Sequence, residues 1–225
     1  GYLGADWAKL EIPQTVNGTL VTGIAAGAFQ GQTAIETVML SAGVTSIGAS
    51  AFAGCSKLRS INLEQVTNLG QSAFSQCTAL TAVQLGEGLT EVPESAFSGC
   101  QQLASVTLPS TVKALDKNAF CLCTSLRSLT LPEGLTAIHA AALLGCPLRE
   151  LHLPSTLKQM GDKYMGDVFE EAGQNPADTT LTNITVAENN PLYSAEDGLI
   201  YNKEQTELVF CPRGRDTAKV KEGVT

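Results

Sequence analysis

The chain has 225 residues, a formal net charge of -8 at pH 7, 44% hydrophobic residues and 5% aromatic residues. This composition is typical of a folded protein whose core relies on aliphatic side chains, and it excludes a disordered or a fibrous chain. An acidic balance also excludes nucleic acid as a partner, because a protein that neutralises phosphates needs clustered Lys and Arg.

The first 23 residues precede a long periodic region, and we expect them to form a capping half-repeat. From residue 24 to residue 160, one pattern returns every 22 or 23 residues. Its aromatic position is occupied by Phe29, Phe52, Phe74, Phe97 and Phe120, and then by Leu143. Three aliphatic columns, which begin at Ile24, Ile35 and Leu40, keep the same period. Such a period predicts stacked repeats, each too small to bury its own apolar face.

Each repeat is predicted to hold a short strand and, on the opposite side of the coil, a helical or 3₁₀ turn. In residues 126–131, Leu129 and Leu131 alternate with polar residues, which is the period of a half-buried strand. Pro132 follows directly and has no N–H with which to extend a ladder. The turn is expected around residues 118–123, where nothing alternates. The predicted fold class is therefore an α/β solenoid with short parallel strands on one face.

The regular pattern ends after Met160, and residues 161–215 are predicted to form an irregular repeat. The next strand pattern starts at Leu181, 21 residues after Met160, where 10 or 11 residues separate the corresponding positions in earlier repeats. We expect a projecting loop in residues 161–180, with a short helix near 168–172. Farther along, residues 199–202 and 207–212 flank a polar turn and predict a β-hairpin.

The last residues, 216–225, are predicted to begin a further, truncated repeat. The stretch "KVKEGVT" matches "QLGEGLT" and "TLPEGLT" of earlier repeats, which places Val224 in register with Leu89 and Leu135. We therefore expect the chain to be a processed or engineered piece of a longer protein whose repeats continue.

The units "VTSIGASAFAGCSKLRSINL" and "VKALDKNAFCLCTSLRSLTLPEGL" resemble BspA-like leucine-rich repeats, the Treponema pallidum-type class found in many bacterial surface proteins. The opening "YLGADWAKLEIPQTVNGTLVTGIAAGAF" is similar to the start of such arrays, and "NPLYSAEDGLIYNKEQTELVFCPRG" to a hairpin insert common in them. The resemblance implies a right-handed curved solenoid, secretion or surface display, and adhesion to proteins or cells. It implies no catalytic residue.

A column of cysteines allows two interpretations. Its members are Cys55, Cys77, Cys100, Cys123 and Cys146. They could form a disulfide or metal framework, or they could be buried free thiols. Zinc sites use close pairs rather than a 23-residue spacing, and side chains that stack in parallel do not favour the disulfide torsion of about 90°. We favour free thiols that pack as small apolar groups. The redox compartment stays open.

We expect no enzyme activity, no cofactor and no metal site. The two histidines, His139 and His152, are expected on different faces of the coil and too far apart to complete a site. No HExxH, GxSxG or glycine-rich phosphate loop occurs. The glycosylation sequons at Asn17 and Asn183 would be unused in a bacterial protein.

The outward positions of the predicted strands form a concave strip of small polar side chains with arginines at one margin. The candidate ligand-binding residues in this strip are Asn62, Gln84, Thr107, Arg127, Thr130, Arg149, Glu150 and His152. Such a strip suits an extended partner, because the strands present donors and acceptors at regular intervals. Two alternatives stay open: the polar side chains only keep the sheet soluble, or the loop at 161–180 makes the contact.

The function we predict is that of a secreted or cell-surface monomer that binds a protein or glycan ligand from a host or a microbe. The alternative is a structural spacer within a larger surface protein. No stretch reaches the roughly 18 to 20 apolar residues of a membrane-spanning helix, and no secretory signal is present in the chain.

Overall fold

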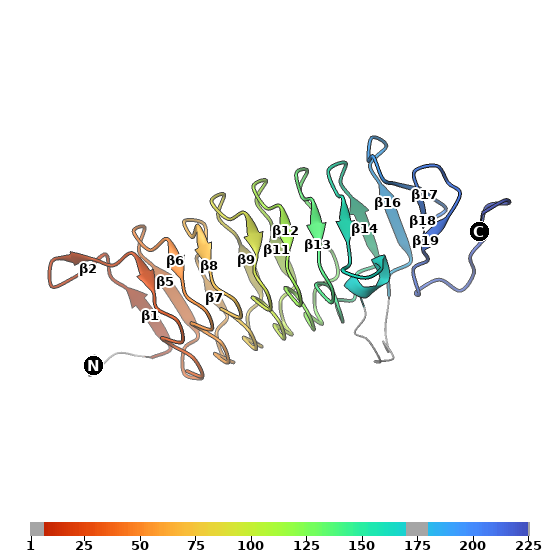
Figure 1. The fold of residues 1–225 in the computed structure, drawn as a ribbon. Coiled ribbons are helices and arrows are strands. Elements are labelled where there is room, and N and C mark those ends of the chain that lie inside the picture. The colour runs from red at the N-terminus through yellow and green to blue at the C-terminus, as the bar shows by residue number, and fades with distance from the viewer. Residues whose placement is uncertain (1–6, 170–179, 225) are drawn as a thin grey trace.

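The chain winds into coils stacked along one axis, in a computed structural model that describes residues 7–169 and 180–224. Figure 1 shows the coils side by side, from the N-terminal end in red to the C-terminal end in blue. The six regular coils are coil 1 (23–45), coil 2 (46–67), coil 3 (68–90), coil 4 (91–113), coil 5 (114–136) and coil 6 (137–158). The predicted solenoid with parallel strands is therefore confirmed.

The ladder of strands that the sequence predicts runs along one face. Its strands are β1 (Lys9–Ile12), β5 (Thr37–Leu40), β7 (Ser60–Ile61), β9 (Ala82–Gln84), β11 (Ser105–Thr107), β14 (Glu150–Leu153) and β16 (Asn183–Val186). β1, β5 and β7 form one parallel sheet, β9 pairs with β11, and β14 pairs with β16. A bridge between Leu63 and Leu85 joins coil 2 to coil 3. Coils are thus held together by backbone hydrogen bonds that link one repeat to the next.

Coil 5 departs from the strand prediction. Residues 126–131 are not a strand, although Leu126, Leu129 and Leu131 are buried while Ser128 and Thr130 are exposed. Period-two alternation specifies which side chains face the core, but it does not provide a hydrogen-bonded partner for the backbone. The predicted orientation of these side chains is therefore correct, and the predicted strand is wrong.

A second ladder, which the sequence did not predict, runs along another side of the coils. Its strands are β4 (Gly23–Ile24), β6 (Ser46–Ile47), β8 (Asn68–Leu69), β10 (Glu91–Val92), β12 (Ala114–Leu115), β13 (Ala137–Ile138) and β15 (Gln159–Met160). β4, β6 and β8 form one parallel sheet, and β10, β12, β13 and β15 form another. The expectation of strands on one face only is wrong. A two-residue strand with one buried side chain is too short to show alternation in a sequence.

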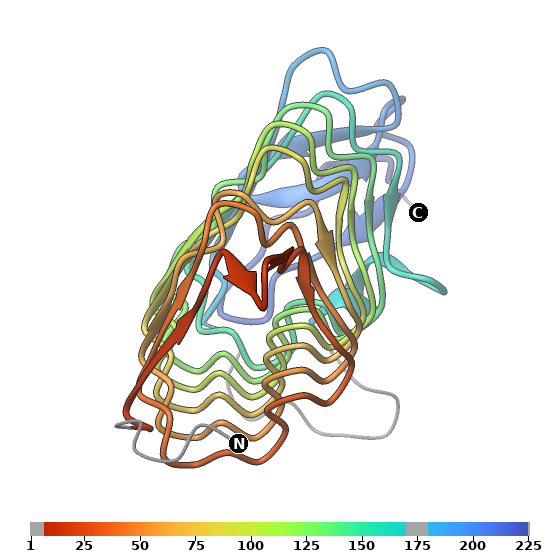
Figure 2. The same ribbon diagram turned by 90° about the vertical axis from the view of Figure 1, so that its left-hand side faces the viewer.

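The predicted helical turns are instead a series of hydrogen-bonded turns, and no helix occurs within coils 1–6. In coil 2, the N–H of Ala53 donates to Ser50 O and that of Cys55 to Phe52 O, whereas the N–H groups of Phe52 and Gly54 donate to coil 3. Ser50 and Gly54 have φ angles of 54° and 74°. A left-handed residue every fourth position interrupts a right-handed helix. Figure 2, which looks along the stack, shows these turns as a wavy edge repeated from coil to coil.

Phenylalanine rings stack through the interior from coil to coil. The ring centroids of Phe29, Phe52, Phe74, Phe97 and Phe120 are successively 5.2, 5.5, 5.4 and 5.5 Å apart. The rings from Phe52 to Phe120 are fully buried, whereas Phe29, at the N-terminal end, is partly exposed. Each ring stacks on its neighbours in adjacent coils, so the stability of one coil depends on the next.

The segment after β15 contains the 3₁₀ helix η1 (Met165–Val168). The Asp167 carboxylate accepts the N–H groups of Asp162 and Lys163 and fixes the turn before η1, which shares only Val168 with the helix predicted near 168–172. Residues 170–172, and half of the predicted projecting loop, lie outside the described residues. Farther along, β17 (Tyr193–Glu196), β18 (Leu199–Asn202) and β19 (Leu208–Phe210) form an antiparallel sheet, of which β17 was not predicted.

A small hairpin projects at the N-terminal end of the stack. Its strands are β2 (Thr15–Val16) and β3 (Thr19–Leu20), which pair in antiparallel orientation (Figure 1). Asn17 and Gly18 have φ angles of 50° and 79°, as a two-residue hairpin turn requires. Before the hairpin, β1 pairs with β5, so part of the predicted capping segment extends the first ladder.

Candidate functional site

The candidate strip consists of the eight residues predicted from the sequence, and it lies on coils 2–6. Gln84 is in β9, Thr107 in β11, and Glu150 and His152 in β14. Arg149 directly precedes β14. Asn62 follows β7, whereas Arg127 and Thr130 belong to the unpaired segment of coil 5. All eight side chains are exposed except that of Asn62, which is half-buried.

The structure brings together some members of the strip in direct register. Gln84 and Thr107 are opposite each other on the paired strands β9 and β11. His152 is opposite Thr185 on β16, and its Nδ1 is 2.8 Å from Thr185 Oγ1. This hydrogen bond leaves the other ring nitrogen of His152 available at the surface. Thr130 has no ladder partner among the described residues, because its segment is not a strand.

Asn62 has a structural role that the sequence analysis did not predict. Its Oδ1 accepts a hydrogen bond from Leu40 N at 2.7 Å, and its Nδ2 donates to Leu40 O at 3.0 Å. Both ends of the amide therefore continue the ladder from coil 1 to coil 2. A side chain with this double bond to the backbone is less available to a ligand than Gln84 or Thr107.

The charges beside the strip are unevenly paired. Arg59 lies 3.8 Å from the Glu36 carboxylate and forms an exposed ion pair. Arg127 and Arg149 occupy the same position in coils 5 and 6 and make no ion pair with the described residues. Unpaired guanidinium groups beside small polar side chains can bind carboxylates with two parallel hydrogen bonds. The C-terminal half of the strip therefore carries two exposed arginines without an ion-pair partner among the described residues.

A cluster of charged side chains near the second ladder was missed by the sequence analysis. His139 Nδ1 is 2.7 Å from Asp162 Oδ1, and His139 Nε2 is 4.0 Å from Asp116 Oδ1. Lys117 Nζ is 3.1 Å from Asp162 Oδ2. Asp116 and His139 directly follow β12 and β13, and Asp162 comes two residues after β15. The shared position after each strand was a signal for this cluster, which links coils 5 and 6 to the irregular segment.

The hydrogen bond from His139, and to a smaller extent Lys117, lowers the pKa of Asp162. The two carboxylates face opposite nitrogens of His139, so the three groups do not converge on a point where a metal ion could bind. Across residues 7–169 and 180–224, no group of three His, Cys, Asp or Glu side chains could hold a metal ion.

The column of cysteines forms a ladder of thiol hydrogen bonds, and its members are free. Cys77 Sγ donates to Phe52 O at 3.1 Å, and Cys100 Sγ donates to Phe74 O at 3.2 Å. Cys55, Cys123 and Cys146 make the same bond to the coil before. Burial raises the pKa of Cys100 to about 12. A buried, protonated thiol is a poor nucleophile, so Cys100 is not a reactive group.

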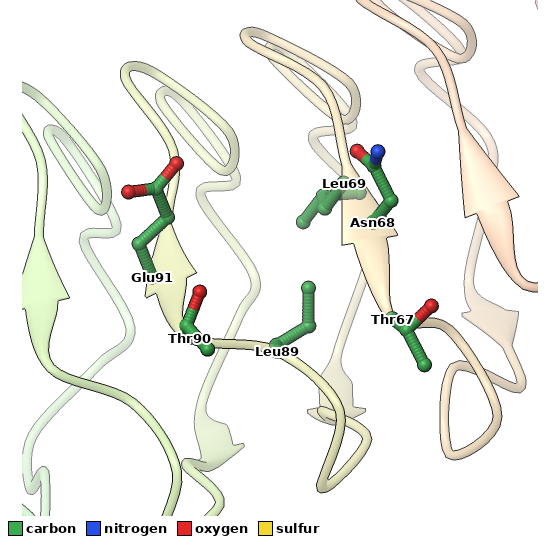
Figure 3. A pocket seen from close by; sticks show the side chains of 6 residues that line it. All are labelled: Thr67, Asn68, Leu69, Leu89, Thr90 and Glu91. Atoms are coloured by element: carbon green, nitrogen blue, oxygen red, sulfur yellow. The ribbon is translucent and has the colours of Figure 1, made fainter.

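A cleft opens on the second ladder between β8 and β10. It has a volume of about 220 Å³ and is lined by Thr67, Asn68, Leu69, Leu89, Thr90 and Glu91. Figure 3 shows the side chains of Leu69 and Leu89 reaching into the space between the two strands. Asn68 and Glu91 stand along its margins, one on each strand (Figure 3). No residue of this cleft was singled out from the sequence.

Pro93 explains why the second ladder is interrupted at this cleft. At the equivalent position, the N–H of Gly48 donates to Ile24 O, that of Gly70 to Ile47 O, and that of Asp116 to Val92 O. Pro93 has no N–H to donate to Leu69 O. Within the described part of the chain, no backbone hydrogen bond joins residues 67–69 to residues 90–92. Pro93 can be seen in the sequence, but its effect on the hydrogen bonds between coils could not be predicted without the second ladder.

The chain is similar to one protein family. A family model described as "BspA type Leucine rich repeat region" matches residues 22–67 and 63–168, in six copies. No curated protein sequence matches the chain. No helix among the described residues is long and apolar enough to cross a membrane.

Solved bacterial structures share the fold. A leucine-rich cell surface protein from Faecalibacterium prausnitzii is 26% identical, with a TM-score of 0.76 over 96% of this chain and 58% of that one. A leucine-rich repeat protein from T. pallidum is 29% identical, with a TM-score of 0.61 over 70% of each chain. The pneumococcal vaccine antigen PcpA, at 22% identity and a TM-score of 0.59 over 97% of this chain and 50% of that one, shows the fold alone. The chain thus spans little more than half of the first of these proteins.

Proposed function

Because the chain belongs to the BspA-type leucine-rich repeat family, we propose that it is part of a secreted or cell-surface bacterial protein that binds a protein or glycan ligand through the strip. The cell-surface relative from F. prausnitzii supports the location. The proposal gives the chain no catalytic step and no cofactor.

The observation that carries this proposal is the chemistry of the strip. Its side chains are polar or charged, all except Asn62 are exposed, and Gln84 and Thr107 are opposite each other on paired strands. Arg127 and Arg149 are exposed and have no ion-pair partner among the described residues. Arginine is one of the residues most enriched at the energetically dominant positions of interfaces. We propose that the ligand lies along the strip and is anchored at its arginine end.

The test begins with a protein and glycan array probed with the purified chain. A variant that combines Gln84→Glu, Thr107→Glu and His152→Glu places three carboxylates along the strip and should abolish binding to any ligand that the array identifies. The matched control combines Thr22→Glu, Thr45→Glu and Lys158→Glu, which are exposed positions beside the second ladder. Equal binding by the two triple variants would show that the ligand does not use the strip.

A structural spacer is the second candidate, and the continuous stacking of coils favours it. Four successive phenylalanine contacts and the ladders on two sides give a rod held together along its length. A spacer predicts no ligand on the array. Labelling of intact cells with an antibody against the chain tests the location, since an intracellular protein is labelled only after lysis.

A further inference from the structure

The cleft between β8 and β10 lies away from the strip and has no part in the proposed function. The strip belongs to the first ladder, whereas the cleft interrupts the second. The cleft lies between coils 3 and 4, and packed residues close one of its ends. A Cβ atom at Gly88 would lie 2.2 Å from Thr67 Cγ2, so the loop before β10 packs directly on the residue before β8, beside the cleft. The opening is therefore local, and the coils close up again next to it.

The interruption of the ladder leaves hydrogen-bonding groups of the backbone without partners. Beside β6, Thr45 O accepts the N–H groups of Thr67 and Asn68, and Ile47 O accepts that of Gly70. The equivalent acceptors beside β8 are the carbonyls of Thr67 and Leu69, which accept no backbone N–H from the described residues. Carbonyl oxygens at a cleft can accept hydrogen bonds from the hydroxyl groups of a ligand. A ligand with several hydroxyl groups would replace the bonds that Pro93 cannot make.

The side chains around the cleft add both polar and apolar contacts. Asn68 offers an amide that donates and accepts, Thr90 a hydroxyl, and Glu91 a carboxylate that accepts only. Leu69 and Leu89 extend between the two strands (Figure 3). Leu69 and Leu89 are buried, and the exposed lining of the cleft is mostly polar, which suits the hydroxyl groups around the edge of a sugar ring. Glu91 disfavours a ligand that carries a carboxylate, sulfate or phosphate.

The volume limits the ligand to one ring. At about 30 Å³ per water molecule, a cleft of about 220 Å³ holds roughly seven waters. Pockets for drug-sized ligands start at about 300 Å³. An extended oligosaccharide could place only one of its units here. We propose that the cleft between β8 and β10 binds a single neutral pyranose unit, with Glu91 and Asn68 binding its hydroxyl groups.

The experiment is an NMR titration of the complete chain with methyl glycosides of glucose, galactose and mannose, and with glucuronate as the charged comparison. A site for one small ring binds with a dissociation constant of about a millimolar. Binding should shift the side-chain amide signals of Asn68 for at least one neutral glycoside, and more weakly or not at all for glucuronate. If none of the three glycosides shifts these signals, or glucuronate binds as well as they do, the proposal is wrong.

Two kinds of variant locate the binding. Glu91→Gln should weaken binding about tenfold, because a hydrogen bond to a charged acceptor is lost. Glu94→Gln is the matched control, since Glu94 is exposed in the same coil but does not line the cleft. Pro93→Gly introduces the residue found at this position in coils 2 and 3, and its new N–H should donate to Leu69 O and close the cleft.

The closing variant has its own readout. Amide hydrogen exchange should show that the N–H of residue 93 is protected in Pro93→Gly, and the same variant should lose the sugar-dependent shifts. Pro93→Asp, which copies Asp116 of coil 5, provides a second route if the glycine variant is unstable. A protected amide at residue 93 together with unchanged sugar binding would contradict the proposal, as would equal binding by Glu91→Gln and Glu94→Gln.

Discussion

The thiol of Cys100 donates a hydrogen bond to the backbone carbonyl of Phe74, and the Sγ–O distance is 3.2 Å. This bond crosses from coil 4 to coil 3, the same two coils whose second ladder is interrupted at Pro93. The Phe74 carbonyl also accepts the N–H of Cys77 in its own coil. The hydrogen-bonded turns around Phe74 and Cys100 therefore hold coils 3 and 4 together, whereas the second ladder does not.

Alkaline pH is expected to destabilise the folded chain through the buried thiols. Burial raises the pKa of Cys100 from 9.0 to about 12. Above pH 9 the unfolded protein loses this proton while the folded protein keeps it, so the free energy of unfolding falls as pH rises toward 12. Urea unfolding at pH 7.5, 9 and 10 measures the effect. Cys100→Ala should reduce the dependence on pH, and Cys211→Ala is the half-buried control. Identical pH profiles for these two variants would contradict the prediction.

The stacked rings predict a difference between the middle and the end of the solenoid. Phe97 stacks on Phe74 and Phe120, whereas Phe29 stacks on Phe52 and is partly exposed. Phe97→Ala should lower the free energy of unfolding by about 3–5 kcal/mol, as expected for a buried phenylalanine. Phe29→Ala should cost clearly less. Chemical denaturation of both variants checks this, and equal losses would show that burial by neighbouring coils does not govern stability.

Acid is expected to weaken the link between coil 6 and the irregular segment. The hydrogen bond from His139 lowers the pKa of Asp162 below its ordinary value of 3.8. This carboxylate therefore contributes stability above pH 3.8, and the contribution is lost as the pH falls through the lowered pKa. The difference in stability between the native chain and Asp162→Asn should shrink below pH 4. Asp116→Asn, on the distant nitrogen of His139, is the control and should change stability less.

The period of the sequence predicted the solenoid and the core, because each buried column must return once per coil. Phe52, Leu58 and Leu63 lie in the interior as their spacing required. The second ladder could not be predicted in this way. Each of its strands places one buried residue, such as Ile47, beside one partly exposed residue, such as Ser46, and two residues do not define a strand period.

The sites depend on features that lie between coils, which a single repeat does not reveal. The strip could be predicted because exposed residues alternate with buried ones in β9 and β14. The cleft could not, because it results from a bond that Pro93 fails to make to Leu69, 24 residues earlier in the chain. The cluster around His139 likewise joins residues 23 apart.

Asn190 is a fully buried polar side chain at the repeat position that Leu135 and Leu157 occupy in coils 5 and 6. Its Nδ2 donates to Pro154 O at 2.9 Å and Leu157 O at 3.1 Å, and its Oδ1 accepts the N–H groups of Leu192 and Tyr193. Asn190→Leu should destabilise the chain by about 3 kcal/mol or more, because several buried backbone groups lose a partner at about 1–3 kcal/mol each. Asn190→Asp keeps the acceptor but sets a carboxylate oxygen against Pro154 O and Leu157 O in a fully buried site, so it should also destabilise the chain in thermal or urea unfolding. A fully stable leucine variant would show that these bonds are dispensable.

Leu122 occupies a backbone conformation that its side chain disfavours, and its replacement should stabilise the chain. Its φ is 58°, whereas the equivalent residues Gly54, Gly99 and Gly145 have φ angles of 74°, 73° and 72°. The left-handed conformation costs a residue with a Cβ atom about 1–2 kcal/mol, and glycine offsets part of this gain by its greater freedom in the unfolded state. Leu122→Gly should therefore raise the free energy of unfolding by about 0.5–1 kcal/mol. The Leu122 side chain is 48% exposed, so its removal forfeits little burial.

Leu122→Ala separates the effect of the lost side chain from that of backbone strain, because it removes the side chain but keeps the Cβ atom. In urea unfolding, the glycine variant should have a higher free energy of unfolding than the alanine variant. The reverse order would mean that the hydrogen bonds between coils, such as that from Leu122 N to Leu144 O, hold this conformation without strain.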